Sequence, residues 1–265
     1  MTNASRIAGT MAAVIVCLPI WAASQSTAAP PKLAAEDQKT LEQFLGKGIV
    51  GNPVDDKPID DAVKTSGLSL GSCDYHVTGG DHKGGSQQWV IDHPKGQPDT
   101  SWRATHSHEW VMFLNTPDDG NVYLASEIDY HQGVITKYSP AIPLLVKGMK
   151  SGDNHRMKTA IKVFDVKHTD HLEHKGSMNI TVTHLGNHQI TVPAGKYEAA
   201  ILKYDFEGKV GPAKVQDTLY RCFAEGVGVV ARVEQKNISA AFFYHDTTKM
   251  GMVLAGTKET PKKSK

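Results

Sequence analysis

The sequence predicts an all-β protein with a short N-terminal helix, in which a large curved antiparallel meander sheet forms a half-barrel. The first observation is the hairpin at residues 188–206, where Pro193 presets the φ angle of a turn and Gly195 can adopt positive φ. The second is that short alternating segments recur through residues 157–245, with turn residues and no crossover helix between them. The third is strand number, because a twisted sheet of about ten or more strands has to curl, split or close.

Each predicted strand has one apolar and one polar face. In the second arm of the hairpin, Leu202 and Tyr204 fall on one face, whereas Lys203 and Asp205 fall on the other. Residues 177–184 alternate in the same way. We therefore expect neighbouring strands to share a single apolar side, on the concave face of the sheet.

Residues 1–29 resemble a secretory signal peptide. Arg6 precedes an apolar run over residues 7–21, and small residues follow up to Ala29. The run is too short to span a membrane and Pro19 breaks its end. We expect cleavage, a periplasmic or secreted location in a bacterium, and no transmembrane segment in the mature chain.

Residues 30–66 are predicted to form an N-terminal helix and a connector. The helix occupies residues 34–46, with acidic residues in its first turn and Leu41, Phe44 and Leu45 at helical spacing. The connector is rich in Pro, Asp and Gly, with one helical turn. We expect the helix to cover part of the concave face.

Residues 67–255 are predicted to be a single antiparallel β domain, and residues 256–265 a basic disordered tail. Besides the two arms of the hairpin, the expected strands span residues 73–78, 87–92, 102–114, 121–130, 134–138, 157–167, 177–185, 214–223, 227–235 and 238–245.

The charge balance argues against a nucleic-acid partner. The chain has 29 Lys and Arg, and removing residues 1–29 takes away only Arg6, which leaves 28 basic residues against 28 acidic ones. Proteins that bind the phosphate backbone carry a basic excess. We expect no nucleic-acid binding.

Two cysteines remain in the mature chain, Cys73 and Cys222. In an oxidising compartment an even pair usually forms a disulfide bond, and this one would join the first β segment to a strand near the end of the chain. The alternative is two separately buried thiols. We expect the disulfide.

His106 and His108 are the strongest candidates for a functional site. If residues 102–114 form one unbroken strand, both imidazoles share a face with Trp102 and Trp110. The two imidazoles would then be polar groups in an apolar ligand cavity lined by Trp102 and Trp110, or they would be two ligands of a metal site. Alternatively, a turn leaves the histidines in water, or they are buried with backbone partners. No cofactor and no metal site are assigned.

One further motif has the wrong context. Gly67-Leu-Ser69-Leu-Gly71 matches G-x-S-x-G, but that motif works only between a buried strand and a helix, and here a polar segment precedes it and a β-prone segment follows. We therefore assign no catalytic residue.

Two motifs carry a resemblance to a known family. Val-Pro-Ala-Gly-Lys-Tyr at residues 192–197 and Ala-Glu-Gly-Val-Gly-Val-Val at residues 224–230, with Gly226 and Gly228, resemble the paired signature of the exported bacterial β-proteins grouped as domain of unknown function 3108. Glu225 stands where that signature often has proline. The resemblance implies a periplasmic or secreted curved antiparallel sheet, similar in outline to lipoprotein-carrier half-barrels, with no established activity.

These observations lead to three hypotheses. The first is an exported, non-enzymatic protein whose concave face binds a lipid-like or other apolar small molecule for envelope maintenance. The second is a metal-dependent or hydrolytic enzyme that uses His106 and His108. The third is a structural module of the envelope. Protein partners and oligomeric state are not predicted.

Overall fold

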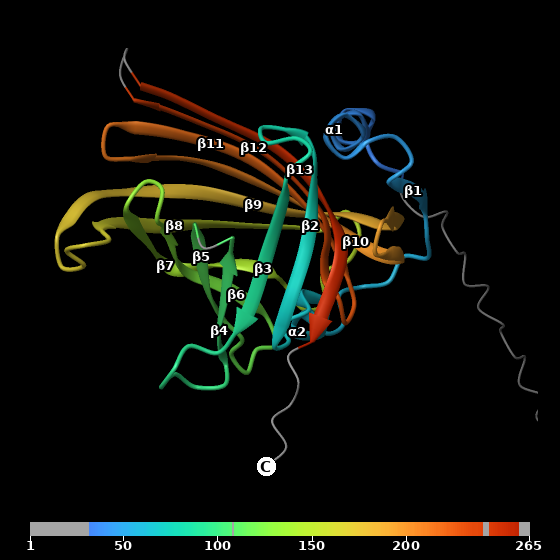
Figure 1. The fold of residues 1–265 in the computed structure, drawn as a ribbon, viewed down its shortest axis with the longest axis horizontal. Helices are drawn as coiled ribbons and strands as arrows, with labels where there is room; N and C mark the ends of the chain where they lie inside the picture. The colour runs from blue at the N-terminus through green and yellow to red at the C-terminus, as the bar shows by residue number, and fades with distance from the viewer. Residues whose placement is uncertain (1–31, 108, 241–243, 260–265) are drawn as a thin grey trace, which may run out of the picture.

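A computed structural model describes residues 32–107, 109–240 and 244–259 (Figure 1). The predicted signal peptide lies outside the described residues. The helices are α1 (Ala35–Leu45) and α2 (Ala62–Ser66). The strands are β1 (Val50–Pro53), β2 (Gly71–Gly80), β3 (Ser86–Asp92), β4 (Ser101–His106), β5 (Trp110–Asn115), β6 (Val122–Asp129), β7 (Val134–Leu145), β8 (Asn154–Asp165), β9 (Leu172–Val192), β10 (Gly195–Val210), β11 (Ala213–Ala224), β12 (Gly228–Ala240) and β13 (Tyr244–Glu259).

The strands form one antiparallel sheet that closes on itself. Each strand from β2 to β12 pairs with the next strand along the chain, and β13 pairs back onto β2. The short β1 joins the far end of β9, where Val50 pairs with Ile190. The predicted all-β class with a short N-terminal helix is confirmed, and the curvature continues to complete closure.

The predicted hairpin at residues 188–206 is present. β9 ends at Val192 and β10 begins at Gly195, so Pro193 and Ala194 form the connection, and Gly195 has φ of 145°. At the turn between β11 and β12, Gly226 and Gly228 have φ of 76° and 92°. A Cβ on Gly228 would collide with the backbone of α2, which explains why only glycine fits there.

Two predicted strands have different boundaries. Residues 102–114 are a hairpin of β4 and β5, because the chain turns at Ser107, which has φ of 45°. Residues 238–245 are not one strand, since Ile238 belongs to β12 and Tyr244 begins β13.

The predicted tail begins too early. β13 continues to Glu259, with Thr257 opposite Cys73 and Lys258 opposite Ser72. An ion pair of 3.4 Å between Lys258 and Asp74 adds to this pairing. Residues 256–259 are therefore part of the sheet, and the remainder of the predicted tail lies outside the described residues.

The helix α1 covers the outer face of the sheet and not the concave one. Asp37 accepts hydrogen bonds from Lys203 Nζ at 3.1 Å and from the Tyr220 hydroxyl at 2.7 Å. Lys203 and Tyr220 are a cross-strand pair on the face opposite Leu202 and Arg221. Figure 1 shows α1 outside the curve of the strands. The expectation that this helix covers the concave face is wrong.

The helix can lie close to the sheet because glycines are beneath it. Gly79 of β2 and Gly251 of β13 are paired, and a Cβ on either would collide with the carbonyl oxygen of Phe44. The side chains of Leu41, Phe44 and Leu45 are buried.

The predicted disulfide is absent, because Cys73 and Cys222 are both free. Cys73 lies on β2 and Cys222 on β11, with β12 and β13 between them. Three strand spacings of roughly 4.8 Å separate the two strands by about 14 Å, whereas a disulfide needs Cα atoms within roughly 7 Å. Each thiol is accommodated separately.

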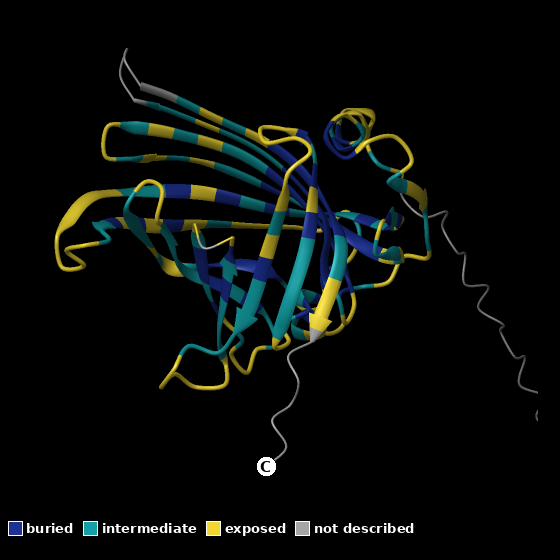
Figure 2. Cartoon of the chain, viewed as in Figure 1, coloured by how far each residue is buried: buried dark blue, intermediate teal, exposed yellow. Residues whose placement is uncertain are grey.

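The closed sheet is tightly packed at one end only. Tyr75 donates a hydrogen bond to the Val229 carbonyl at 2.8 Å, and Tyr204 donates one to the Leu144 carbonyl, with Leu202 and Met252 fully buried beside them. Figure 2 shows buried residues concentrated where the long strands converge, while the far ends of these strands are intermediate or exposed. None of the helices in the described part of the chain is long and apolar enough to cross a membrane.

Candidate functional site

The loosely filled end of the sheet contains a cavity of about 930 Å³. It is lined from β5 round to β12, so it lies inside the closed sheet. Sites for small molecules and cofactors typically measure roughly 300 to 1,000 Å³. The cavity is therefore large enough for a sizeable organic ligand.

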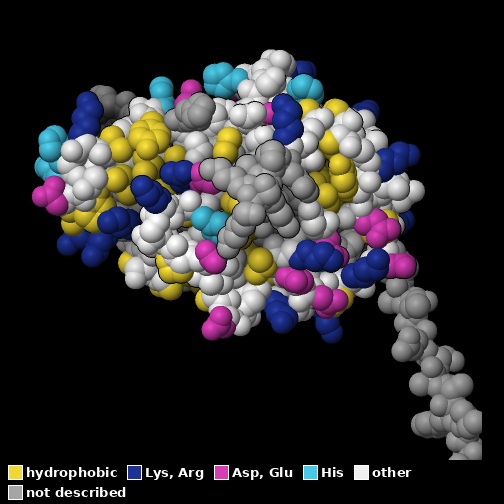
Figure 3. Space-filling view, turned by 60° about the horizontal axis from the view of Figure 1, so that its bottom comes forward, with side chains coloured by type: hydrophobic (Ala, Val, Ile, Leu, Met, Phe, Trp, Pro, Cys, Tyr) yellow, Lys and Arg dark blue, Asp and Glu magenta, His cyan; other side chains and the backbone are white. Residues whose placement is uncertain are grey.

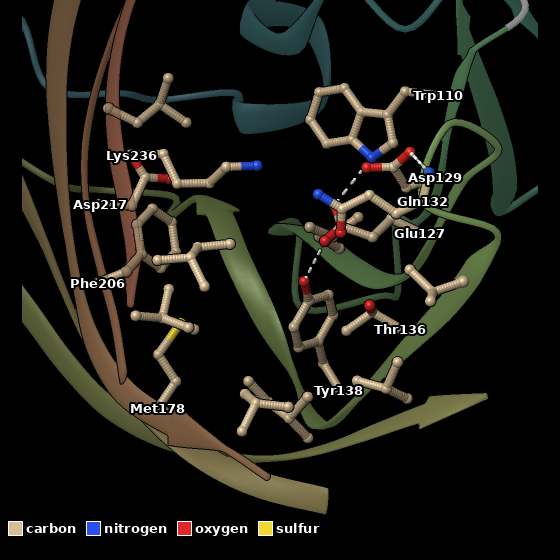
Figure 4. A pocket seen from close by; sticks show the side chains of 18 of the residues that line it. Trp110, Glu127, Asp129, Gln132, Thr136, Tyr138, Met178, Phe206, Asp217 and Lys236 are labelled. Atoms are coloured by element: carbon tan, nitrogen blue, oxygen red, sulfur yellow. Dashed lines mark hydrogen bonds between the residues drawn. The ribbon is translucent and has the colours of Figure 1, made fainter. Parts of the chain in front are cut away.

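One wall of the cavity is apolar. Alternation along β8 to β11, interrupted at two register shifts, points every second side chain inwards, and the inward ones are mostly aliphatic or aromatic. This wall contains Ile161, Val163, Met178, Phe206, Val210, Val215 and Leu219. In Figure 4, Met178 and Phe206 lie across the cavity from Tyr138 and Trp110.

The opposite wall contains a hydrogen-bonded carboxylate. Glu127 accepts a hydrogen bond from the Tyr138 hydroxyl at 2.5 Å and another from Trp110 Nε1 at 3.2 Å (Figure 4). Burial raises the pKa of Glu127, and these two donors oppose that rise. The carboxylate is thereby fixed in one orientation.

A second acid lies among the apolar residues of β11. Asp217 points inwards between Val215 and Leu219, and its Oδ1 has no hydrogen-bond partner among the described residues. Burial raises the pKa of Asp217 to about 7, helped by the charge of Glu234. The side chain is therefore partly protonated near neutral pH.

Two arginines lie deeper in the cavity. Arg221 of β11 and Arg232 of β12 are a cross-strand pair, with exposed fractions of 4% and 2%. Arg232 forms an ion pair of 2.7 Å with Glu234, whereas Arg221 has no ion pair within the described ranges. Burial, followed by the charge of Arg232, lowers the pKa of Arg221 to about 10, so it remains charged at neutral pH.

Aromatic rings support both guanidinium groups. Arg221 lies 5.6 Å from the ring centre of Tyr204, and Arg232 lies 5.2 Å from Trp110 and 5.8 Å from Trp89. Cation–π contacts of this kind stabilise a desolvated cation but leave its N–H donors free. The Nε atoms of both arginines have no hydrogen-bond partner among the residues that the structure describes.

His106 is buried beside these groups. Its ring is stacked on Trp89 at 3.9 Å between centroids and meets Trp110 edge-on at 4.6 Å. Burial lowers the pKa of His106 well below its usual value, and the charges of Arg232 and Arg221 add to this. His106 is therefore a neutral part of the packed end and does not line the cavity.

The other predicted site residues have different positions. Trp110 lines the cavity, because the β4–β5 register places it directly opposite His106 on the inward face. Trp102 packs against His93 at 3.9 Å and is not part of the cavity wall. His108 lies outside the described residues. The structure thus joins Trp110 and His106 by cross-strand pairing, not by the unbroken strand that the sequence suggested.

The residues for a metal-dependent or hydrolytic site do not come together in the described part of the chain. It contains no group of three His, Cys, Asp or Glu side chains that could hold a metal ion. Ser69 lies between α2 and β2, the reverse of the strand-to-helix order that the nucleophile motif needs.

The mouth of the cavity is polar. A second hollow of about 590 Å³ adjoins it and shares His82, Asp129, His131, Gln132 and Lys236 with the cavity wall. The face of the molecule in Figure 3 has basic and acidic side chains interspersed, with hydrophobic side chains in separate patches.

Sequence reasoning missed the charged residues of the cavity, although a signal for two of them exists. On β11, Asp217 and Arg221 occupy the same alternating positions as Val215 and Leu219. A charged side chain on the apolar face of a strand indicates either that another side chain pairs with it or that it belongs to a binding site. Glu127 and Tyr138 have no comparable signal, because β6 and β7 alternate less regularly.

Comparisons with known proteins give only weak likenesses. No family model matches the chain, and no curated protein matches it. A protein of Parabacteroides distasonis described as a lipoprotein aligns with TM-score 0.35 and 14% identity, over 72% of this chain and 96% of its own. A protein of Bacteroides fragilis, described as exported and as having a YmcC-like fold, aligns with TM-score 0.33 and 9% identity, over 72% of this chain and 96% of its own. The hypothetical lipoprotein YmcC of Escherichia coli aligns with TM-score 0.37 and 9% identity, over 71% of this chain and 87% of its own. These scores are too low to transfer a function to this chain.

Proposed function

We propose that this protein is an exported, non-enzymatic binding protein that holds a lipid-like, largely apolar molecule inside its closed sheet. The observation that carries the proposal is the cavity of about 930 Å³ with a largely apolar wall. The export signal suggested by residues 1–29 and the family resemblance of the glycine motifs favour a role in the bacterial envelope.

The apolar wall supplies the driving force for binding. Phe206, Val210 and Val215 are only half-buried, although they point towards the interior. Covering apolar surface that is in contact with water is favourable by about 25 cal/mol per Å². An acyl chain or a similar hydrocarbon placed along β10 and β11 would gain this energy.

A fluorescent probe tests the proposal directly. N-phenyl-1-naphthylamine is neutral and apolar, and its emission rises in an apolar site. We expect saturable binding to the wild-type protein. The variant Val215→Trp, which fills the cavity from β11, should weaken binding by about tenfold or more, because it removes space from the apolar wall.

The neighbouring residue provides a matched control. Gln216 lies on the same strand but points outwards and is exposed. Gln216→Trp should bind the probe like the wild type. Equal binding by the wild type and Val215→Trp would show that the probe binds elsewhere and would contradict the proposal.

A further inference from the structure

We propose that the ligand is an amphiphile with an anionic head, and that Arg221 receives the head group while the hydrocarbon lies along β10 and β11 towards the mouth. This inference rests on the proposed function, because it names the chemical class of the molecule in the same cavity. The shared chemistry is a carboxylate or a phosphate monoester on an alkyl chain.

The first argument is a local concentration of buried positive charge where the two arginines meet, in a cavity whose wall also contains the acids Glu127 and Asp217. Arg221 and Arg232 are directly opposite on adjacent strands, where like charges destabilise the sheet. Glu234 pairs with Arg232, and within the described residues Arg221 has neither an ion pair nor a partner for its Nε. A buried charge without a partner is unfavourable. An anion at this position would neutralise it.

The second argument is that the carboxyl groups of the cavity wall do not fill this role. Asp217 lies four residues along β11 from Arg221, which separates their Cα atoms by about 13 Å in an extended strand. Burial lowers the pKa of Arg221 and the charges of Glu234 and Asp217 oppose this, yet neither carboxylate forms an ion pair with it. Glu127 is already engaged by Tyr138 and Trp110. The structure thus leaves the guanidinium of Arg221 available to a group from outside the protein.

The third argument is geometric. Tyr204 supports one face of the Arg221 guanidinium, and its planar fork of N–H donors matches carboxylate and phosphate oxygens. From Arg221 the inward residues of β11 continue through Leu219, Asp217 and Val215 to Ala213 at the start of the strand, which also lines the cavity. The charged end of the ligand would be deep, and the chain would extend outwards.

The test compares three ligands with the same alkyl chain: hexadecanoic acid, hexadecyl phosphate and hexadecan-1-ol. Each displaces N-phenyl-1-naphthylamine from the wild-type protein at low ionic strength and neutral pH. At least one anion should bind about tenfold or more tightly than the alcohol, as expected for a charge-assisted hydrogen bond. The tighter of the two anions identifies the head group.

The variant Arg221→Met should weaken binding of that anion by about ten- to hundredfold and change binding of the alcohol by less than about threefold. Lys214→Met removes an outward-facing charge from the same strand and should leave all three affinities unchanged. If Arg221→Met fails to fold, the comparison of the anions with the alcohol in the wild-type protein still tests whether the site prefers an anionic head group.

Two outcomes would overturn the inference while leaving the proposed function intact. One is an alcohol that binds as tightly as both anions. The other is a folded Arg221→Met variant whose affinity for all three ligands falls by the same factor. If the wild type binds neither the probe nor any of the three ligands, the proposed function fails and the inference fails with it.

Discussion

Arg221 and Arg232 lie opposite each other on β11 and β12, and both side chains point into the closed sheet. Only Arg232 has a carboxylate within ion-pair distance in the described part of the chain. Packing alone does not account for two neighbouring guanidinium groups that are 4% and 2% exposed. The pair therefore supports the proposed anion site at the deep end of the cavity, and we expect it to cost stability.

That cost can be measured. Arg221→Met replaces a buried, unpaired charge by an apolar side chain of similar length, so protein stripped of ligand should gain about 1 kcal/mol or more in free energy of unfolding. Urea unfolding of the wild type and the variant gives the difference. Lys214→Met should stay within about 0.5 kcal/mol of the wild type. A loss of stability in Arg221→Met would mean that its contact with Tyr204 outweighs the burial of the charge.

Asp217 should make stability depend on pH. Its pKa in the folded protein, about 7, lies above that of an unfolded Asp, so the folded state binds the proton more tightly. The contribution of this group to stability is therefore present at low pH and is lost as pH rises from about 4 to about 7. Asp217→Asn should be more stable than the wild type at pH 8, and the difference should shrink towards pH 5.

Thermal unfolding at several pH values measures this effect. Glu207→Gln on β10 is a suitable control, because Glu207 is exposed and points away from the cavity. A difference between Asp217→Asn and the wild type that stays constant from pH 5 to pH 8 would contradict the assignment.

The contact between α1 and the sheet depends on glycine. Gly251→Ala should lower the free energy of unfolding by about 1 to 3 kcal/mol, because the new methyl group collides with the Phe44 carbonyl. Gly256→Ala on the same strand is the matched control, since no atom lies within 4 Å of its added Cβ. Chemical denaturation of both variants tests this, and equal effects would mean that α1 does not pack on Gly251.

Both cysteines should react as thiols. Iodoacetamide added to the mature protein in denaturant without reductant should modify Cys73 and Cys222, as detected by mass spectrometry, because two strands separate them. Protein that is labelled only after reduction would contain the disulfide that the sequence first suggested.

The fold class could be predicted from local patterns, whereas closure of the sheet could not. The alternation of residues 188–206 and the Pro193 turn depend on neighbours in the sequence. Closure depends on β13 pairing with β2, which lie at opposite ends of the domain. The basic end of β13 resembles a frayed tail in the sequence, although Lys258 pairs with Ser72 of β2.

The site was harder to predict for a similar reason. The turn between β4 and β5 contains no Gly or Pro, so residues 102–114 looked continuous, and Ser107 takes the positive φ instead. The alternation predicts His106 as a site residue because it falls on one face with Trp102 and Trp110, yet its ring is packed between Trp89 and Trp110. Arg221 gains its meaning only from Arg232, which the sequence places eleven positions away on another strand.

The most direct test of the central claim is to identify what the protein carries. The full chain is purified without detergent from bacterial cells, extracted with organic solvent, and the extract is analysed by mass spectrometry beside an extract of Val215→Trp. We predict a lipid-like amphiphile in near-stoichiometric amount in the wild type and much less of it in the variant. Repeated wild-type preparations without such a molecule, from protein that also fails to bind added N-phenyl-1-naphthylamine, would contradict the account.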